Sequence, residues 1–143
     1  SGRIACVARF RNDINRHVSQ IVTTRVASLN SPWLAGFELG ELHSIAVSHG
    51  EGKFVVSDEL AQELFDNGQV AFQYADSEGR ATAEAPCNPN GSNFAIEGLI
   101  SRDGQILGKM GHTERWEENL YKNIAGNREQ AIFRNAVNYF RKR

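Results

Sequence analysis

Short runs of β-branched and aromatic residues alternate with glycine- and proline-containing breaks along the first part of the chain. Residues 18–28, VSQIVTTRVAS, are rich in valine and threonine and predict one strand. Residues 42–57, LHSIAVSHGEGKFVVS, predict two strands that are joined by a glycine-rich turn at residues 50–52. The N-terminal part of the chain is therefore predicted to be rich in strands.

Two further strand pairs are predicted in the middle of the chain. Residues 69–77 predict a strand, and residues 80–85 are predicted to pair with it across a short turn. Residues 94–101 and 105–111 are apolar runs separated by Arg102-Asp103-Gly104, which is a strong hairpin signal. Antiparallel pairing is thus expected to dominate this region.

Two helices are predicted from capping residues and apolar spacing. The first begins after Ser57 as N-cap and ends at Asn67-Gly68. The second is predicted to begin near Asn127, with Gln130 three residues on as in a capping box. Its apolar stripe consists of Ile132, Phe133, Ala136, Val137 and Phe140.

These elements predict one α/β domain over residues 1–143. A complete doubly wound α/β domain would need more crossover helices than the pattern provides. The chain is therefore predicted to correspond to the second half of such a domain.

Composition narrows the class of protein without identifying it. The chain is 41% hydrophobic and 23% charged with a formal net charge of −1, so no nucleic-acid partner is expected. The cations of residues 141–143 are expected to complement the C-terminal end of the last helix. No apolar run approaches the length of a membrane span, and no signal peptide is recognised. Two cysteines predict no disulfide framework, and a cytoplasmic location is expected.

His112 and Glu114 are the leading candidates for catalysis. Residues two apart on an extended segment project to the same side, so the carboxylate can accept a hydrogen bond from one imidazole nitrogen. That bond would fix the tautomer and leave the other nitrogen available as a base. The alternative is a surface histidine beside a loop carboxylate.

Other candidate groups carry weaker signals. His43 and His49 flank a predicted strand, and His49 opens an H-G-E-G turn. Glycines there could let the backbone approach a ligand closely, and the alternative is a simple hairpin turn. A zinc site of His43, His49, His112 and Cys87 is conceivable, but no metal-binding spacing supports it, so no metal is expected. Neither Cys6 nor Cys87 lies in the sharp strand-to-helix turn that exposes a nucleophile.

Three segments in this order carry a sharper signal: SHGEGKFV at 48–55, NPNGS at 88–92 and IEGLISRDGQILGKMGHTER at 96–115. Together they resemble the glutaminase domain of phosphoribosylformylglycinamidine synthase, a purine-pathway amidotransferase. Residues 15–26 and 119–127 resemble the single-chain form of that enzyme. The resemblance covers nearly the whole chain. It implies a flavodoxin-like class I glutamine amidotransferase fold, here its C-terminal portion with added antiparallel strands.

The resemblance also implies a Cys-His-Glu triad that releases ammonia from glutamine. His112 takes the position of the base and Glu114 that of the orienting carboxylate. The ammonia would pass to a synthetase domain of the parent chain, which uses ATP and Mg²⁺ to form an amidine. The expected partners are glutamine and that synthetase domain, with no cofactor in this chain. No residue is assigned to glutamine binding.

The nucleophile is where the chain departs from the family pattern. Its cysteine lies in a G-x-C-N-G elbow upstream of the segment that resembles residues 15–26, and residues 1–14 contain no such elbow. Cys6 is too close to this segment and has different neighbours. Residues 1–143 are therefore expected to form the C-terminal part of the domain, inactive in isolation for lack of the cysteine.

Two other functions remain open at this point: a non-catalytic module that binds a synthetase partner or a metabolite, and an unrelated metal hydrolase. A sheet without its first half would expose an unpaired edge, so self-association of the isolated chain is expected. Residues 18–26 are predicted to form that edge.

Overall fold

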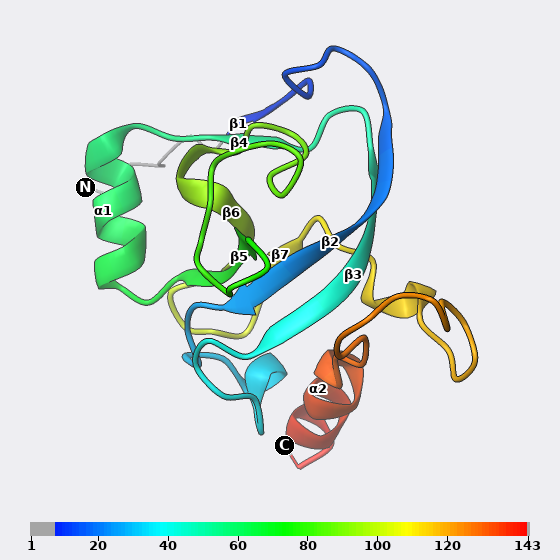
Figure 1. Cartoon of the computed structure of the whole chain (residues 1–143). Helices are drawn as coiled ribbons and strands as arrows, with labels where there is room; N and C mark the ends of the chain where they lie inside the picture. Colours follow the sequence, from blue (N-terminus) through cyan, green and yellow to red (C-terminus); the bar gives the residue numbers. More distant parts are fainter. Residues whose placement is uncertain (1–7, 143) are drawn as a thin grey trace.

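A computed structural model describes residues 8–142 of the chain (Figure 1). The strands are β1 (Ala8–Phe10), β2 (Val18–Val26), β3 (Leu42–His49), β4 (Lys53–Val55), β5 (Val70–Ala75), β6 (Ile96–Ile100) and β7 (Leu107–Lys109). The α-helices are α1 (Asp58–Asp66) and α2 (Ile132–Phe140), and the 3₁₀ turns are η1 (Pro32–Leu34), η2 (Asn93–Ala95) and η3 (Thr113–Arg115). No helix in this part of the chain has the length and apolar character to cross a bilayer.

The main sheet has five strands in the order β3-β2-β5-β6-β7, and every neighbouring pair is antiparallel. The β6–β7 hairpin was predicted and is confirmed. The prediction that residues 18–26 form the exposed edge is wrong, because β2 pairs with β3 on one side and with β5 on the other. In the described part of the chain the outer strands are β3 and β7.

The glycine-rich stretch at residues 50–52 does not close a hairpin. β3 pairs with β2, whereas β4 pairs with β1 in a separate two-stranded sheet. The Asn12 side chain stabilises the change of direction between β3 and β4. Its amide donates to the His49 carbonyl over 2.7 Å, and its oxygen accepts from the Gly52 N–H over 3.2 Å. Residues far apart in the sequence thus satisfy the turn and direct the chain into the second sheet.

The predicted strand at residues 80–85 is also not formed as such. Its pairing with β5 is limited to a bridge between Ala75 and Ala81 and a bond of 3.1 Å from the Thr82 N–H to the Tyr74 carbonyl. After this short contact the chain continues into the N-P-N-G-S loop at residues 88–92.

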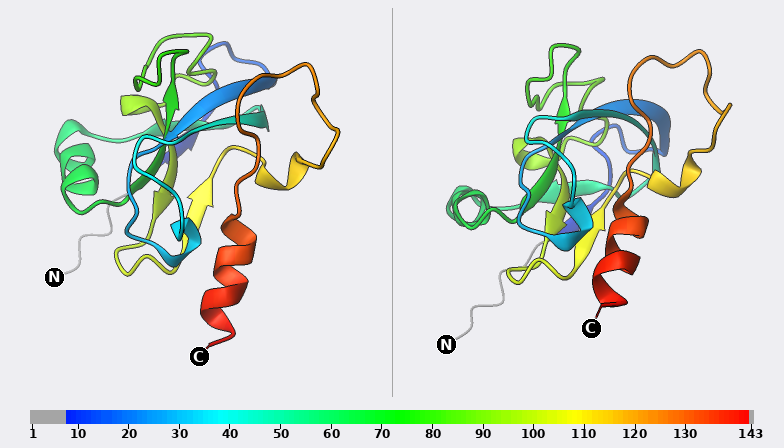
Figure 2. Two further views of the ribbon diagram at one scale, coloured as in Figure 1. Left: turned by 60° about the horizontal axis from the view of Figure 1, so that its bottom comes forward. Right: turned by 90° about the horizontal axis from the view of Figure 1, so that it is seen from below.

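The first helix agrees with its sequence signals. The Ser57 hydroxyl accepts from the Leu60 N–H, and the helix ends at Asp66, just before Asn67-Gly68. It lies at the side of the molecule away from α2 in Figures 1 and 2. Its buried residues, Ala61 and Leu64, belong to the predicted apolar face.

The second helix begins later than predicted. It starts at Ile132 and Asn127 does not cap it, since the Asn127 side chain accepts from the Glu129 N–H in a local turn. Gln130 does not complete a capping box either, because its side chain is buried and binds Lys109 and Thr113. Of the predicted stripe, Ile132 and Ala136 are buried, whereas Phe133, Val137 and Phe140 remain exposed. Arg141 is the C-cap of this helix, as expected for a cation there.

The core lies against the sheet. One cluster joins β2, β5, β6 and α2 through Val26, Phe72, Ile100 and Ile132, with the ring of Trp33 packed against it. This packing brings η1 and α2 together beside β7, where the chain enters the segment containing His112. Figure 2 shows α2 extending from this region away from the sheet.

Candidate functional site

His112 lies three residues beyond the end of β7, where the chain leaves the hairpin. Its backbone N–H donates to the Ala46 carbonyl over 2.8 Å, which makes an isolated bridge to β3. The next residues form η3, with His112 as its N-cap residue. The main sheet therefore holds the backbone of His112 from two sides, through the hairpin and through β3.

His112 and Glu114 form the pair that the sequence predicted. The imidazole Nδ1 lies 2.6 Å from Glu114 Oε1, a short, charge-assisted contact. The local conformation differs from the expectation, because the two residues lie at a 3₁₀ turn and not on an extended segment. The turn brings the side chains together equally well. The catalytic role of the pair stays a prediction at this stage.

The contact determines which imidazole nitrogen is available. With Nδ1 bound to the carboxylate, the tautomer that donates from Nδ1 leaves a lone pair on Nε2. Nε2 has no hydrogen-bond partner among residues 8–142. Partial burial raises the pKa of Glu114, but the hydrogen bond from His112 and the nearby positive charges outweigh it, so that pKa lies below its usual value. Glu114 is thus ionised at neutral pH, which favours this orientation of the ring.

The pair borders a pocket of about 360 Å³. Trp33, Ile132 and Phe133 supply apolar walls, and residues 107–111 also line the pocket. The Trp33 indole N–H donates to the Gln105 carbonyl over 2.9 Å, which fixes the ring beside β7. No signal in the sequence connects Trp33 or Phe133 with His112, because only tertiary packing places η1 and α2 there.

His43 lies inside the molecule and is not part of an exposed site. Its Nε2 is 3.0 Å from Glu41 Oε1, and its ring packs edge-on against Phe37 with centroids 5.3 Å apart. Burial lowers the pKa of His43, and the charge of Lys109 acts in the same direction, whereas Glu41 opposes both. His43 is therefore a buried, neutral histidine at neutral pH.

His49 belongs to a buried network that joins the H-G-E-G turn to the N-P-N-G-S loop. His49 Nδ1 lies 3.0 Å from the Asn12 side-chain oxygen. The Asn90 amide donates to the Gly52 carbonyl over 2.8 Å and to the Tyr74 hydroxyl over 3.1 Å. The two sequence motifs thus meet in space as a structural unit.

The residues of the conceivable zinc site are not assembled. Within residues 8–142 no group of three or more histidine, cysteine or acidic side chains could hold a metal ion. Cys87 is half-buried and forms no disulfide, and Cys6 lies outside the described residues.

Comparison with known proteins gives one consistent relationship. Residues 4–140 match the family of CobB/CobQ-like glutamine amidotransferase domains. The chain is 40% identical over 121 residues to the phosphoribosylformylglycinamidine synthase subunit PurQ of Chlorobaculum tepidum, covering 85% of this chain and 51% of that protein. It is 36% identical over 137 residues to the PurQ subunit of Methanosarcina acetivorans, covering 96% of this chain and 57% of that protein. The chain thus spans about half the length of these curated relatives.

A solved structure shares the fold. The structure of PurLQS from Thermotoga maritima contains a chain that matches with a TM-score of 0.68 at 24% identity, over 94% of this chain and 53% of that chain. This agreement supports the α/β fold of class I glutamine amidotransferases, of which the antiparallel sheet described above forms a part.

Proposed function

Because this chain belongs to the family of CobB/CobQ-like glutamine amidotransferase domains, we propose that it is the C-terminal part of the glutaminase domain of a phosphoribosylformylglycinamidine synthase. Its relatives carry the name of the PurQ subunit of that synthase. The domain would supply ammonia from glutamine for amidine formation in purine biosynthesis.

The contact between His112 Nδ1 and Glu114 Oε1 is the observation that carries the proposal. It holds the imidazole with Nε2 directed away from the carboxylate and available to a substrate or a nucleophile. This is the arrangement in which histidine acts as a general base and then as a general acid.

The reaction needs a cysteine that residues 1–143 do not provide in a nucleophile elbow. His112 Nε2 takes the proton of that thiol, and the thiolate attacks the side-chain carbonyl carbon of glutamine. The carbon–nitrogen bond then breaks and the imidazolium returns the proton to the leaving nitrogen, so ammonia departs and a glutamyl thioester remains. Water hydrolyses the thioester to glutamate and restores the thiol, with His112 as the base. Glu114 orients the ring and stabilises the imidazolium.

The ammonia would be used by a synthetase domain with ATP and Mg²⁺, in the cytoplasm. Glutamine and this synthetase domain are the proposed partners of the chain. The pocket beside His112 offers apolar walls, which suit the methylene groups of glutamine.

The test uses the full-length enzyme that carries this domain. His112→Ala is expected to lower glutamine-dependent synthesis by at least about 10³-fold and to leave synthesis from added ammonia largely intact. Glu114→Gln should impair the same step, because an amide does not stabilise imidazolium. His17→Ala is the matched control, since His17 is exposed and contacts Ser48 instead. Equal loss of both activities in His112→Ala would refute the proposed role.

The isolated chain provides a second test. Residues 1–143 alone are expected to release no ammonia from glutamine above background, because the triad lacks its nucleophile. Ammonia release that is abolished by Cys6→Ser would instead assign the nucleophile to Cys6.

A further inference from the structure

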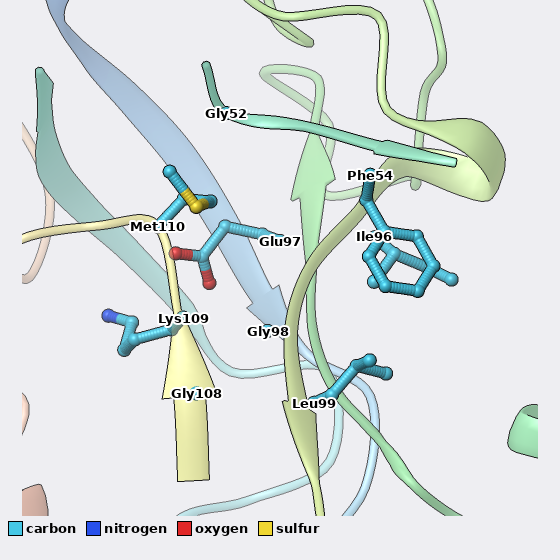
Figure 3. A pocket seen from close by; sticks show the side chains of 9 residues that line it. All are labelled: Gly52, Phe54, Ile96, Glu97, Gly98, Leu99, Gly108, Lys109 and Met110. Atoms are coloured by element: carbon cyan, nitrogen blue, oxygen red, sulfur yellow. The ribbon is translucent and has the colours of Figure 1, made fainter. Parts of the chain in front are cut away.

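One buried and one half-buried charged residue hold the segment that carries His112, and the triad chemistry makes no use of either. They are Glu97 of β6 and Lys109 of β7 (Figure 3). Figure 3 shows the Glu97 carboxylate turned toward the end of β7, while Lys109 points away from Phe54 and Ile96. Removing a charged side chain from water costs free energy unless hydrogen bonds or an opposite charge compensate for the lost hydration.

Glu97 binds the backbone immediately before His112. Its carbonyl accepts from the Met110 N–H over 3.1 Å, and its Oε1 accepts from the Gly111 N–H over 2.5 Å. Only 3% of the residue is exposed. A carboxylate that accepts a backbone N–H in a buried site makes a strong, directional bond. The orientation of the peptide that leads into His112 is therefore fixed by Glu97.

The close approach at this point requires glycine. A Cβ atom on Gly111 would lie 2.6 Å from Ile45 Cγ2 and 2.9 Å from Glu97 Oε1. The backbone is thus pressed between β3 and the carboxylate, and a larger residue would displace one of them.

Lys109 binds the residue immediately after His112. Its Nζ donates to Thr113 Oγ1 over 3.0 Å and to Gln130 Oε1 over 2.6 Å. The Thr113 hydroxyl donates to the same Gln130 oxygen over 2.7 Å, which closes a three-membered cluster. The Nζ also lies 4.9 Å from the centroid of the Phe72 ring. Burial lowers the pKa of Lys109, and the carboxylates of Glu97 and Glu114 oppose that shift.

We propose that Glu97 and Lys109 are positioning residues that fix the peptides on either side of His112 and thereby aim its imidazole at the reacting thiol. The inference rests on the proposed function of His112. The backbone of His112 is held by Ala46, the preceding residue by Glu97 and the following residue by Lys109. A misplacement of about 1 Å at a catalytic group can reduce the rate by about 10²-fold, so bonds that hold the backbone around His112 are expected to raise the rate of glutamine hydrolysis.

The experiment compares Lys109→Met and Glu97→Leu with the wild-type full-length enzyme. Each is expected to lower kcat for glutamine hydrolysis by about 10- to 100-fold, with less than about 3-fold change in the KM for glutamine and in ammonia-dependent synthesis. Glu97→Gln keeps an acceptor oxygen for the Gly111 N–H, so it should recover most of the rate lost in Glu97→Leu. Lys53→Met is the matched lysine control, because Lys53 lies on β4 and pairs with Asp13.

Thr113→Val keeps the test decisive if either larger change prevents folding. It removes only the hydroxyl that accepts from Lys109, with almost no change in volume, and should lower kcat in the same way. The imidazole ¹⁵N chemical shifts of His112 should also change in Thr113→Val and Lys109→Met, because the peptide after His112 is no longer held and the ring shifts relative to Glu114.

The outcomes separate this inference from the proposed function. Wild-type rates in Lys109→Met, Glu97→Leu and Thr113→Val, with His112→Ala inactive toward glutamine, would refute the positioning roles alone. Parallel loss of glutamine- and ammonia-dependent activity in these variants would show that the residues only maintain the fold. Full glutamine activity in His112→Ala would instead refute the proposed function.

Discussion

Replacement of Asn90 by alanine tests whether the buried network between the two sequence motifs stabilises the domain. Asn90 is fully buried and its side chain serves as donor and acceptor at once. The amide donates to the Gly52 carbonyl and the Tyr74 hydroxyl, and the oxygen accepts from the Ser92 N–H over 3.0 Å and the Ser92 hydroxyl over 2.6 Å. Asn90→Ala would therefore remove bonds from the turn at residue 52, from β5 and from its own loop.

The magnitude follows from the groups left without a partner. The Gly52 carbonyl loses its donor and the Ser92 hydroxyl loses its acceptor. Each such loss inside the protein costs about 1–3 kcal/mol. The Ser92 N–H keeps the Asn88 side-chain oxygen at 3.2 Å, so it adds little. Burial raises the pKa of Tyr74, so its hydroxyl stays protonated, and in Asn90→Ala the hydroxyl oxygen loses the donor that Asn90 supplies. We expect a loss of about 3–5 kcal/mol in the free energy of unfolding, a large share of the about 5–15 kcal/mol of a typical domain.

Urea unfolding of the chain, followed by circular dichroism, measures this loss. Asn123→Ala is the control, since Asn123 is exposed in the 116–127 loop, and it should change the stability by less than about 0.5 kcal/mol. Tyr74→Phe removes one bond of the network, and its effect should be less than additive with Asn90→Ala. A loss below about 1 kcal/mol in Asn90→Ala would refute the view that the network holds the two motifs together.

Two further predictions concern pH and association. The pKa of His43 is lowered by burial, so the unfolded chain takes up a proton near pH 6.5 before the folded chain does, and stability should decrease as the pH falls through 6.5 toward the folded value. The free energy of unfolding should decrease between about pH 7.5 and about pH 5.5 in the wild type and in His17→Gln, and should decrease less in His43→Gln. Equal decreases in the wild type and both variants would contradict the assignment to His43. Since β7 is hydrogen-bonded only to β6 within the described residues, the isolated chain is expected to self-associate through this edge. Light scattering checks this, and a concentration-independent monomer with cooperative unfolding would rule it out.

The sequence by itself determined those features that depend on neighbouring residues. The Arg102-Asp103-Gly104 turn specifies the β6–β7 hairpin, and Ser57 and Gly68 delimit α1 within a residue or two. The contact of His112 with Glu114 is equally local, because two residues of spacing bring the side chains together in the observed 3₁₀ turn as well as in a strand. Interactions of this kind need little loop closure, so their energies act on any arrangement of the remaining chain.

Only the tertiary structure decided the order of the strands and the surroundings of His112. The β-branched residues of segment 18–26 predict a strand but not which strands lie beside it, and β2 is an inner strand because β3 and β5 both pair with it. Gln130 looked like a capping residue, yet Lys109 and Thr113 bind it in the core, so α2 begins at Ile132. The bonds of Glu97 to Gly111 and of Lys109 to Gln130 join residues 14 and 21 positions apart. Such contacts exist only once packing has brought the segments together, since desolvation and close approach, not sequence spacing, give these polar groups their energy.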